Sequence, residues 1–352
     1  MASSSLNGVT LYYPDSPCMV WNPCIMRLTG TFARTQVYVS QGGESYSAVY
    51  QTPNGGYIDV REYLKGFFDG SKMGGDLDYQ QSVKGSELGK SVNITIKALS
   101  SDGTTKAQFN ITIFVVWGGL KPLEQYNQPK TVTWFKAFPF MVGRYFAAAE
   151  TLDFGYYQNG QVSPGTTISI TSAGVKNITI DTDFNSGADM LSIAESVSPY
   201  TEYFRIKVDR KHDEGIYLRW VDRQGFWQHW LFKQGDPQRV AASRFGNWDR
   251  INYSLYNQED KYHEGVTGRR QSLTRNDVIP CCAPLVDQET FDFLQDVTTS
   301  PCVDIFLGYD AHDVPMWTGV TIQPGTYTKD VKKPEQDFIF NVVLPEIPIQ
   351  SL

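Results

Sequence analysis

The chain has 352 residues, of which 31 are lysine or arginine and 38 are aspartate or glutamate, so its formal net charge is −7. This charge balance, without a block of basic residues, argues against a protein that binds nucleic acid through its phosphates. The sequence contains no run of about 18 apolar residues, so it predicts no transmembrane helix. Aromatic residues make up 14% of the chain, which favours strands over long helices, and the length favours two or three domains.

The first ten residues, MASSSLNGVT, contain no basic segment followed by an apolar one. They therefore do not resemble a secretory signal, and we expect a protein that is made and assembled in a cytosol.

A first domain is expected over residues 1–118. Short alternating runs separated by glycine-rich turns predict a β-sandwich, with the clearest strands at 34–39, 45–50, 91–99 and 107–117. Apolar residues at helical spacing predict one short helix at 59–68, with Asp59 as a possible cap. Residues 118–122, GGLKP, combine two flexible glycines with a rigid proline and mark the end of this domain.

A second β domain is expected over residues 119–240. It begins with an extended aromatic segment, 131–141, in which Pro139 argues against a central strand, so the segment is an edge strand or a connecting arm. Further strands are predicted at 166–171, 177–181 and 203–209.

The aromatic run GIYLRWVDRQGFWQHWLFKQGD, residues 215–236, predicts a β-hairpin. Side chains alternate on both sides of a short turn at 222–225, and Gly225 can adopt the positive φ that such a turn requires. Both faces carry large apolar groups, so we expect both to be partly covered. The hairpin belongs either to the middle of a β domain or to an interface between subunits.

A third region, residues 241–352, begins with a polar segment of weak alternation that reaches Thr274. The segment is compatible with an excursion of the second domain, with irregular strands or with a loop that orders on a partner. A short helix at 287–296 and strands at 303–307, 316–322 and 337–344 predict a small sheet. The two prolines of residues 345–352 indicate an extended arm. The whole chain is thus expected to be all-β, with two or three sandwich-like domains, short helices and extended termini.

No catalytic or cofactor motif stands out. The four histidines are scattered, and neither a nucleophile elbow nor a phosphate loop is present. The five cysteines lack knuckle spacing, so free, mostly buried thiols are expected rather than a zinc site built from Cys18, Cys24, Cys281 and Cys282. Because glycosidases often show only two distant carboxylates, the missing motifs weigh little by themselves.

Six residues are candidates for an interface or a sugar-stacking platform. Aromatic rings on a β-sandwich can stack on a pyranose ring, whereas rings on both faces of a hairpin are more often core or interface residues. Arginines beside them can stack on rings or pair across an interface. The candidates are Tyr217, Arg219, Trp220, Trp227, Trp230 and Trp248.

The hairpin string IYLRWVDRQGFWQHWLF, the preceding WFKAFPF and the closing strands VDIF, MWTGVTI and FIFNVVLPE carry a family resemblance. The chain resembles tail-associated structural proteins encoded by phages and prophages of the Bacteroidota. The resemblance covers mainly residues 131–352 and depends on the hairpin more than on any catalytic signature. In outline, the N-terminal sandwich followed by a second β domain is similar to a distal tail protein.

The resemblance implies an all-β virion protein of the tail tip, baseplate or distal tail ring, which assembles in the cytoplasm of a bacterial host. It implies a homo-oligomeric ring that contacts other phage tail proteins. From the missing catalytic motifs, the charge balance and the missing apolar run, we expect no enzymatic activity, no cofactor, no nucleic acid and no membrane as partners. The alternative is a carbohydrate-binding β-sandwich adhesin that holds a host glycan with exposed aromatic residues.

Overall fold

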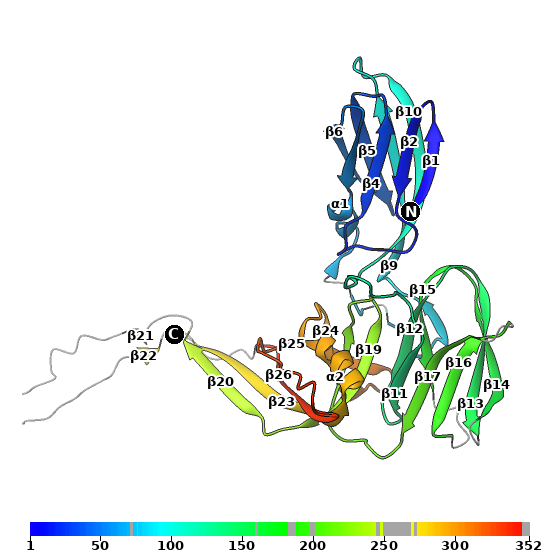
Figure 1. Cartoon of the computed structure of the whole chain (residues 1–352). Helices are drawn as coiled ribbons and strands as arrows, with labels where there is room; N and C mark the ends of the chain where they lie inside the picture. Colours follow the sequence, from blue (N-terminus) through cyan, green and yellow to red (C-terminus); the bar gives the residue numbers. More distant parts are fainter. Residues whose placement is uncertain are drawn as a thin grey trace, which may run out of the picture. The chain divides into compact units, whose positions relative to one another are not determined.

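The structure is a computed structural model, and it describes residues 1–70, 73–75, 77–158, 161–181, 188–197, 201–243, 247–248, 269–270 and 273–346. Strands dominate these residues, and their two α-helices are short (Figure 1). The expected all-β fold class is therefore confirmed. Within the same residues no helix is long and apolar enough to cross a membrane.

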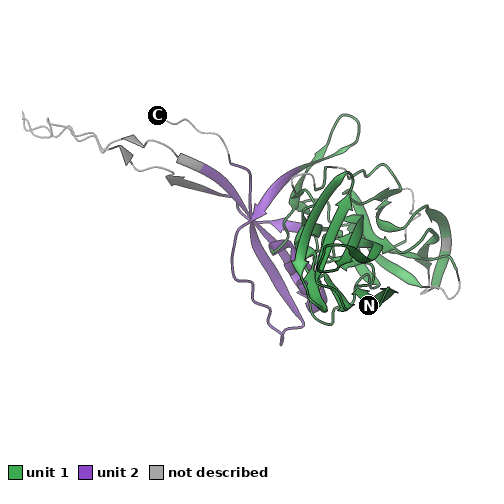
Figure 2. Cartoon of the chain, turned by 90° about the horizontal axis from the view of Figure 1, so that it is seen from above, with its two compact units in different colours: residues 1–231, 299–317 green, residues 232–298, 318–352 purple. Residues whose placement is uncertain are grey.

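The chain forms two compact units, coloured separately in Figure 2. Unit 1 contains Met1–Leu231 and Thr299–Trp317, and unit 2 contains Phe232–Thr298 and Thr318–Leu352. These bounds do not coincide with the expected domain ends at residues 118 and 240. Each unit is discontinuous in sequence, so the chain passes between them three times.

The N-terminal part of unit 1 contains two sheets. One has the strand order β1-β2-β4-β7 and the other β3-β10-β9-β5-β6. The bounds are β1 Ala2–Leu6, β2 Val9–Tyr13, β3 Cys18–Met19, β4 Ile25–Gly30, β5 Arg34–Gln41, β6 Glu44–Gln51, β7 Gly55–Asp59, β9 Gly89–Leu99 and β10 Thr105–Val116.

Alternation along these strands explains how the two sheets share a core. In β9, Val92, Ile94, Ile96 and Ala98 are all buried, as the period of two along a strand requires. Their partners come from both sheets, among them Leu11 of β2. The sequence-based expectation of strands at 34–39, 45–50, 91–99 and 107–117 is confirmed by β5, β6, β9 and β10.

The expected helix at 59–68 is shorter in the structure, where α1 spans Arg61–Lys65. Val60 occupies the N-cap position without a side-chain cap bond, so the expected Asp59 cap is wrong. Asp59 ends strand β7, and its Oδ1 instead accepts hydrogen bonds from the backbone N–H groups of Cys24 and Arg61. The carboxylate thus connects the first residue of α1 to Cys24, which directly precedes β4.

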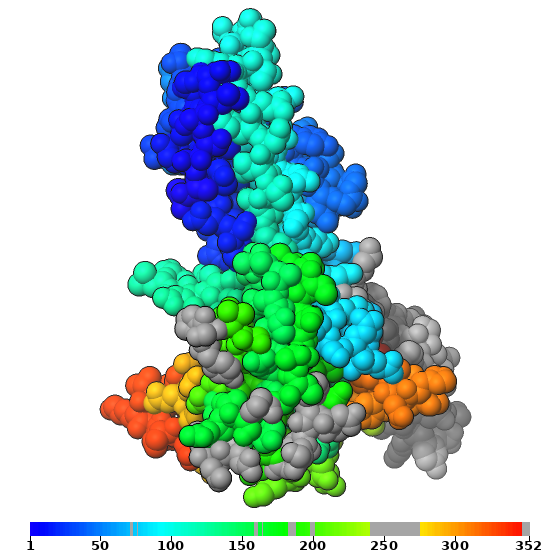
Figure 3. Space-filling view, turned by 90° about the vertical axis from the view of Figure 1, so that its right-hand side faces the viewer, coloured from blue at the N-terminus to red at the C-terminus, as the bar shows by residue number. Residues whose placement is uncertain are grey.

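Two further sheets of unit 1 follow in sequence. They have the strand orders β11-β17-β16-β13-β14 and β12-β15-β8. Strand β8 precedes residue 118 in sequence, yet it pairs with β15, and the cyan segment lies against green strands in Figure 3. The bounds are β8 Val83–Gly85, β11 Lys130–Phe135, β12 Phe140–Phe146, β13 Glu150–Gln158, β14 Gln161–Ile170, β15 Gly174–Ile180, β16 Met190–Glu195 and β17 Glu202–Asp209.

The aromatic segment 131–141 becomes an edge strand, a turn and the start of another strand. Strand β11 pairs in parallel with β17 at the edge of its sheet, and Pro139 lies between β11 and β12. Trp134 and Phe140 on either side of the turn enter one core with residues of β13 and β16. The turn therefore delivers aromatic side chains to the interior rather than to an arm.

The predicted hairpin is confirmed as β18 (Ile216–Val221) and β19 (Trp227–Gln234), with β18 flanked by β19 and β24 (Val303–Tyr309). Gly225 has φ +76°, and its N–H donates to the carbonyl of Asp222. All six residues of β18 are buried. The hairpin is thus central in the fold, as its apolar faces indicated.

Unit 2 contains a sheet in which β23 pairs with β20 on one side and β26 on the other. The predicted helix at 287–296 is confirmed as α2, with Asp287 as its N-cap and Phe291 and Leu294 buried. Most of the polar segment before residue 274, and the end of the expected arm at 347–352, lie outside the described residues. The bounds are β20 Gln238–Ser243, β21 Asn247–Trp248, β22 Arg269–Arg270, β23 Leu273–Asp287, α2 Gln288–Gln295, a 3-10 turn η3 Asp296–Thr298, β25 Pro315–Ile322 and β26 Glu335–Val343.

Candidate functional site

The structure buries most of the residues expected to form an exposed platform. Tyr217, Arg219, Trp220 and Trp227 are each at most 5% exposed. Trp230 is half-buried, and Trp248 belongs to β21, although its side chain lies outside the described part. The expectation of an accessible interface or sugar-stacking surface is therefore wrong for the four buried residues.

The cover on the hairpin comes from distant segments. Phe138 stacks on Tyr217 with ring centroids 4.5 Å apart, and Trp227 packs in one cluster with Leu88 and Val221. Neighbours of this kind cannot be inferred from the hairpin's own alternation, which shows only that both faces need cover.

Arg219 is the centre of a buried polar network. Its Nε donates to Asp304 Oδ2 at 2.8 Å, one terminal nitrogen donates to the Tyr79 hydroxyl, and the other donates to the carbonyl of Gly74. The guanidinium also lies 4.3 Å from the centre of the Trp317 ring, within cation–π range. Burial alone would lower the pKa of Arg219, but Tyr79 and Asp304 raise it above its ordinary value, so the group is charged.

The network continues from Tyr79 to His229. The Tyr79 hydroxyl, which accepts a hydrogen bond from Arg219, lies 3.0 Å from His229 Nε2, so the two side chains share a second hydrogen bond. Burial lowers the pKa of His229 well below its ordinary value, and Arg219 acts in the same direction. His229 is therefore neutral at neutral pH, and its Nδ1 has no hydrogen-bond partner among the described residues.

Tyr79 joins this network to an open pocket of about 290 Å³, which we call the Tyr79 pocket. Burial raises the pKa of Tyr79 to about 12, so its hydroxyl is protonated at neutral pH, and its ring stacks on Trp317. The pocket is lined by Tyr79, Gln80, Trp134, Lys136, Phe138, Pro139, Phe140, Thr179, Ile180, Asp181, Tyr309, Asp313 and Pro315.

The Tyr79 pocket combines buried aromatic residues with a polar rim. Trp134 and Phe140 are buried, whereas Asp181 and Asp313 are exposed. Phe138 is fixed by its stack on Tyr217, and the Trp134 Nε1–H donates to the Phe138 carbonyl at 3.3 Å. The aromatic walls are therefore held in place by contacts outside the pocket.

The rim is organised by the turn between β24 and β25. The Asp310 carboxylate accepts hydrogen bonds from the backbone N–H groups of His312 and Val314, which closes a tight turn. Asp313 in this turn has φ +59°, a conformation that Asp and Asn tolerate better than most residues. The turn thereby presents Asp313 to the pocket that it lines.

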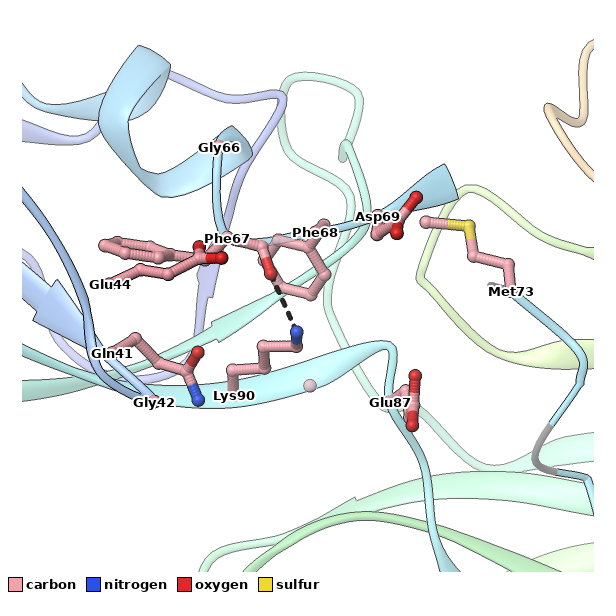
Figure 4. Close-up of a pocket in the computed structure, with 11 residues that line it drawn as sticks. Gln41, Gly42, Glu44, Gly66, Phe67, Phe68, Asp69, Met73, Glu87 and Lys90 are labelled. Atoms are coloured by element: carbon pink, nitrogen blue, oxygen red, sulfur yellow. Dashed lines mark hydrogen bonds between the residues drawn. The ribbon is translucent and has the colours of Figure 1, made fainter. Parts of the chain in front are cut away.

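A second pocket, which we call the Lys90 pocket, has a volume of about 480 Å³ in the N-terminal sandwich (Figure 4). Lys90 lies between Gln41 and Glu44 on one side and Glu87 on the other, and its amine donates to the Phe67 carbonyl at 2.7 Å. The phenylalanines of this pocket are buried, so its accessible lining is mainly polar. It offers no open ring face comparable with those of the Tyr79 pocket.

The cysteines are free, and Cys18, Cys24 and Cys281 are buried, as expected. Cys282 lies next to Cys281 on β23 of unit 2, whereas Cys18 and Cys24 belong to unit 1. In the part of the chain that the structure describes, no three His, Cys, Asp or Glu side chains are grouped closely enough to hold a metal ion.

Sequence reasoning identified Arg219 but missed its partners. Gly74, Tyr79, Asp304 and Trp317 come from segments about 85 to 145 residues away, and no local spacing connects them to the hairpin. The position of Arg219 was the usable signal. It lies between apolar neighbours on a strand that is covered on both faces, and a buried guanidinium there predicts an acidic partner.

Comparisons with known proteins give little further information. No family model matches the chain, and a search of curated proteins gives no match. Among solved structures, a protein of unknown function from Porphyromonas gingivalis W83 is 12% identical, with 56% of this chain and 96% of that chain covered and a TM-score of 0.15. A similarity at this level supports no statement about function.

Proposed function

We propose that this chain is a structural protein of a phage tail, located in the tail tip, the baseplate or the distal tail ring, and that it assembles as a ring protomer. The sequence resemblance of residues 131–352 supports the proposal. Because the aromatic hairpin is buried, the assembly surface must be elsewhere. The observation that best supports self-assembly is the free edge of strand β6.

Among the residues that the structure describes, strand β6 is the last strand of its sheet and β5 is its one pairing partner. Its backbone therefore presents unpaired N–H and C=O groups along eight residues, Glu44–Gln51. Monomeric proteins usually protect such an edge with lysine, proline or a bulge. After Glu44 this strand has the sequence SYSAVYQ, which contains none of these, and its pairing with β5 has no register shift.

Side chains along the edge are also suited to contact with a neighbour. Val49 is 53% exposed, and Tyr38 on the adjacent strand β5 is 42% exposed. An edge that carries no charge after Glu44 and has exposed apolar side chains can accept a strand of another subunit, and head-to-tail pairing forms a ring when the rotation between subunits closes.

Light scattering on the purified chain over a range of concentrations tests the proposal. We expect an oligomer of defined stoichiometry, and Val49→Lys is expected to shift it toward the monomer because the charge would be buried at the subunit contact. Val331→Lys is the matched control, since Val331 is 73% exposed and lies between β25 and β26, outside both strands.

A wild-type protein that is monomeric at every concentration would contradict the ring proposal. An oligomer that Val49→Lys leaves unchanged would contradict the β6 edge as its contact. Electron microscopy of virions labelled with an antibody against the chain would then locate the protein, and the expected position is the tail.

A further inference from the structure

We propose that the Tyr79 pocket binds one neutral sugar ring of hexose size. The inference does not rest on the proposed assembly role, because all the lining residues belong to unit 1 of a single chain. It also differs from the expected hairpin platform, since none of the six candidates of that platform lines this pocket.

The size of the pocket limits the ligand. A volume of about 290 Å³ is just below the range of about 300–1,000 Å³ that small-molecule sites occupy. The pocket therefore accommodates a single ring better than a long chain. Exposed residues at its rim, such as Asp181 and Asp313, leave the site accessible to the end of a larger glycan.

The lining matches the two kinds of surface that a sugar presents. The C–H face of a pyranose packs on aromatic rings, and here Phe138 and Tyr309 are accessible rings. Sugar hydroxyls donate to carboxylates and exchange hydrogen bonds with amides, and Asp313 and Gln80 provide these groups.

Charge determines which sugars fit. The rim carries the carboxylates of Asp181 and Asp313 against the amine of Lys136, so the pocket has an excess of negative charge. A sugar with its own carboxylate would be repelled at short range. A neutral hexose avoids this repulsion and can still donate a hydroxyl proton to Asp313.

The pocket walls are held in position without a ligand. Tyr79 is fixed by hydrogen bonds with His229 and Arg219 and by its stack on Trp317. Because the pocket walls are already ordered, binding does not require free energy to order them, and this favours measurable affinity for a small molecule.

Isothermal titration of the full chain with D-glucose, D-galactose and D-mannose tests the inference, with D-glucuronate as the charged comparison. At least one neutral hexose is expected to bind in the millimolar range, more tightly than D-glucuronate. Asp313→Asn is expected to weaken binding about ten-fold, since asparagine tolerates the φ of +59° but lacks the charge. Asp236→Asn is the matched control, because this exposed aspartate does not line the pocket.

Thermal unfolding of Asp313→Asn separates a binding role from a structural one, because the unfolding midpoint is expected to stay close to that of wild type while sugar binding falls. Failure of all three hexoses to bind, or equal binding by wild type and Asp313→Asn, would overturn the inference. Light scattering of the same samples reports assembly separately, so this failure and failure of the ring proposal are distinguishable.

Discussion

Arg219 and Asp304 form an ion pair in the interior of unit 1, with Nε and Oδ2 2.8 Å apart and side chains that are 6% and 12% exposed. Two charges at this depth have lost most of their hydration, and each compensates the other. The remaining donors of Arg219 are taken up by Tyr79 and Gly74. The pair therefore stabilises the fold only as long as both members are present.

Removing one partner is expected to be more damaging than replacing both. Asp304→Ala leaves a buried guanidinium without its counter-charge, and we expect a loss of about 3–5 kcal/mol in the free energy of unfolding. The double variant Arg219→Met with Asp304→Leu should recover much of that loss, because no buried charge remains. Urea denaturation of Asp304→Ala and of the double variant measures the difference, and equal losses in the two would argue against a buried pair.

His229 is expected to make the fold sensitive to mild acid. Burial holds its folded pKa well below the ordinary value of 6.5, so the neutral form is favoured in the folded state. Its contribution to stability is present above the unfolded pKa and is lost as the pH falls below that value, because the unfolded chain then binds the additional proton.

The variant His229→Phe should remove this acid dependence. Phe140, Tyr217 and Trp317 already surround the position with aromatic rings, so a phenylalanine can pack there, although the hydrogen bond to Tyr79 is lost. Thermal unfolding measured at pH values on both sides of 6.5 should show a smaller decline on acidification in His229→Phe than in wild type. The exposed His312→Gln variant should decline as wild type does.

Gly225 is expected to tolerate no side chain. It has φ +76°, and a Cβ there would lie 2.6 Å from Val116 Cγ1 and 2.7 Å from the Trp117 carbonyl oxygen. Gly42, with φ +57°, has open space around it, so a substitution there measures only the cost of a side chain at positive φ. Gly42→Ala should cost about 1–2 kcal/mol, whereas Gly225→Ala should cost about 1–3 kcal/mol more because of overpacking. Chemical denaturation gives both values, and equal costs would mean that the neighbours of Gly225 move aside.

Helix α2 offers a test within unit 2. The Asp287 side chain accepts a hydrogen bond from the Thr290 N–H at 2.7 Å, as an N-cap residue should. Asp287→Ala is expected to lower the free energy of unfolding by about 1 kcal/mol, while Asp287→Asn, which can still accept the bond, should change it little. The difference between the two variants is measured by urea denaturation followed by circular dichroism.

Local sequence signals predicted the hairpin, α2 and most strands of the N-terminal sandwich, because alternation and turn residues act within about ten residues. Strand β23 was missed for a physical reason. It contains Pro280 and Pro284, and its register shifts between Ala283 and Val286, where Leu285 has φ +50°. A bulge of this kind interrupts the alternation on which strand prediction depends.

The candidate pocket was beyond sequence reasoning for a different reason. Its lining joins Tyr79, Thr179 and Asp313, which no spacing rule relates. The sequence showed that the chain is rich in aromatic residues, but it did not show where their rings are buried. The rings are covered by Phe138, Trp317 and other residues of the same chain, and only tertiary structure reveals that cover.

Because the chain passes between its two units three times, it also limits when each unit can fold during synthesis. Arg219 emerges from the ribosome 85 residues ahead of Asp304, so the nascent hairpin contains a cation without its counter-ion while the intervening 232–298 segment is being made. Unit 1 can be completed only once Trp317 has been translated. Neither unit can therefore be excised as a continuous fragment, and Arg219 can pair with Asp304 only late in translation.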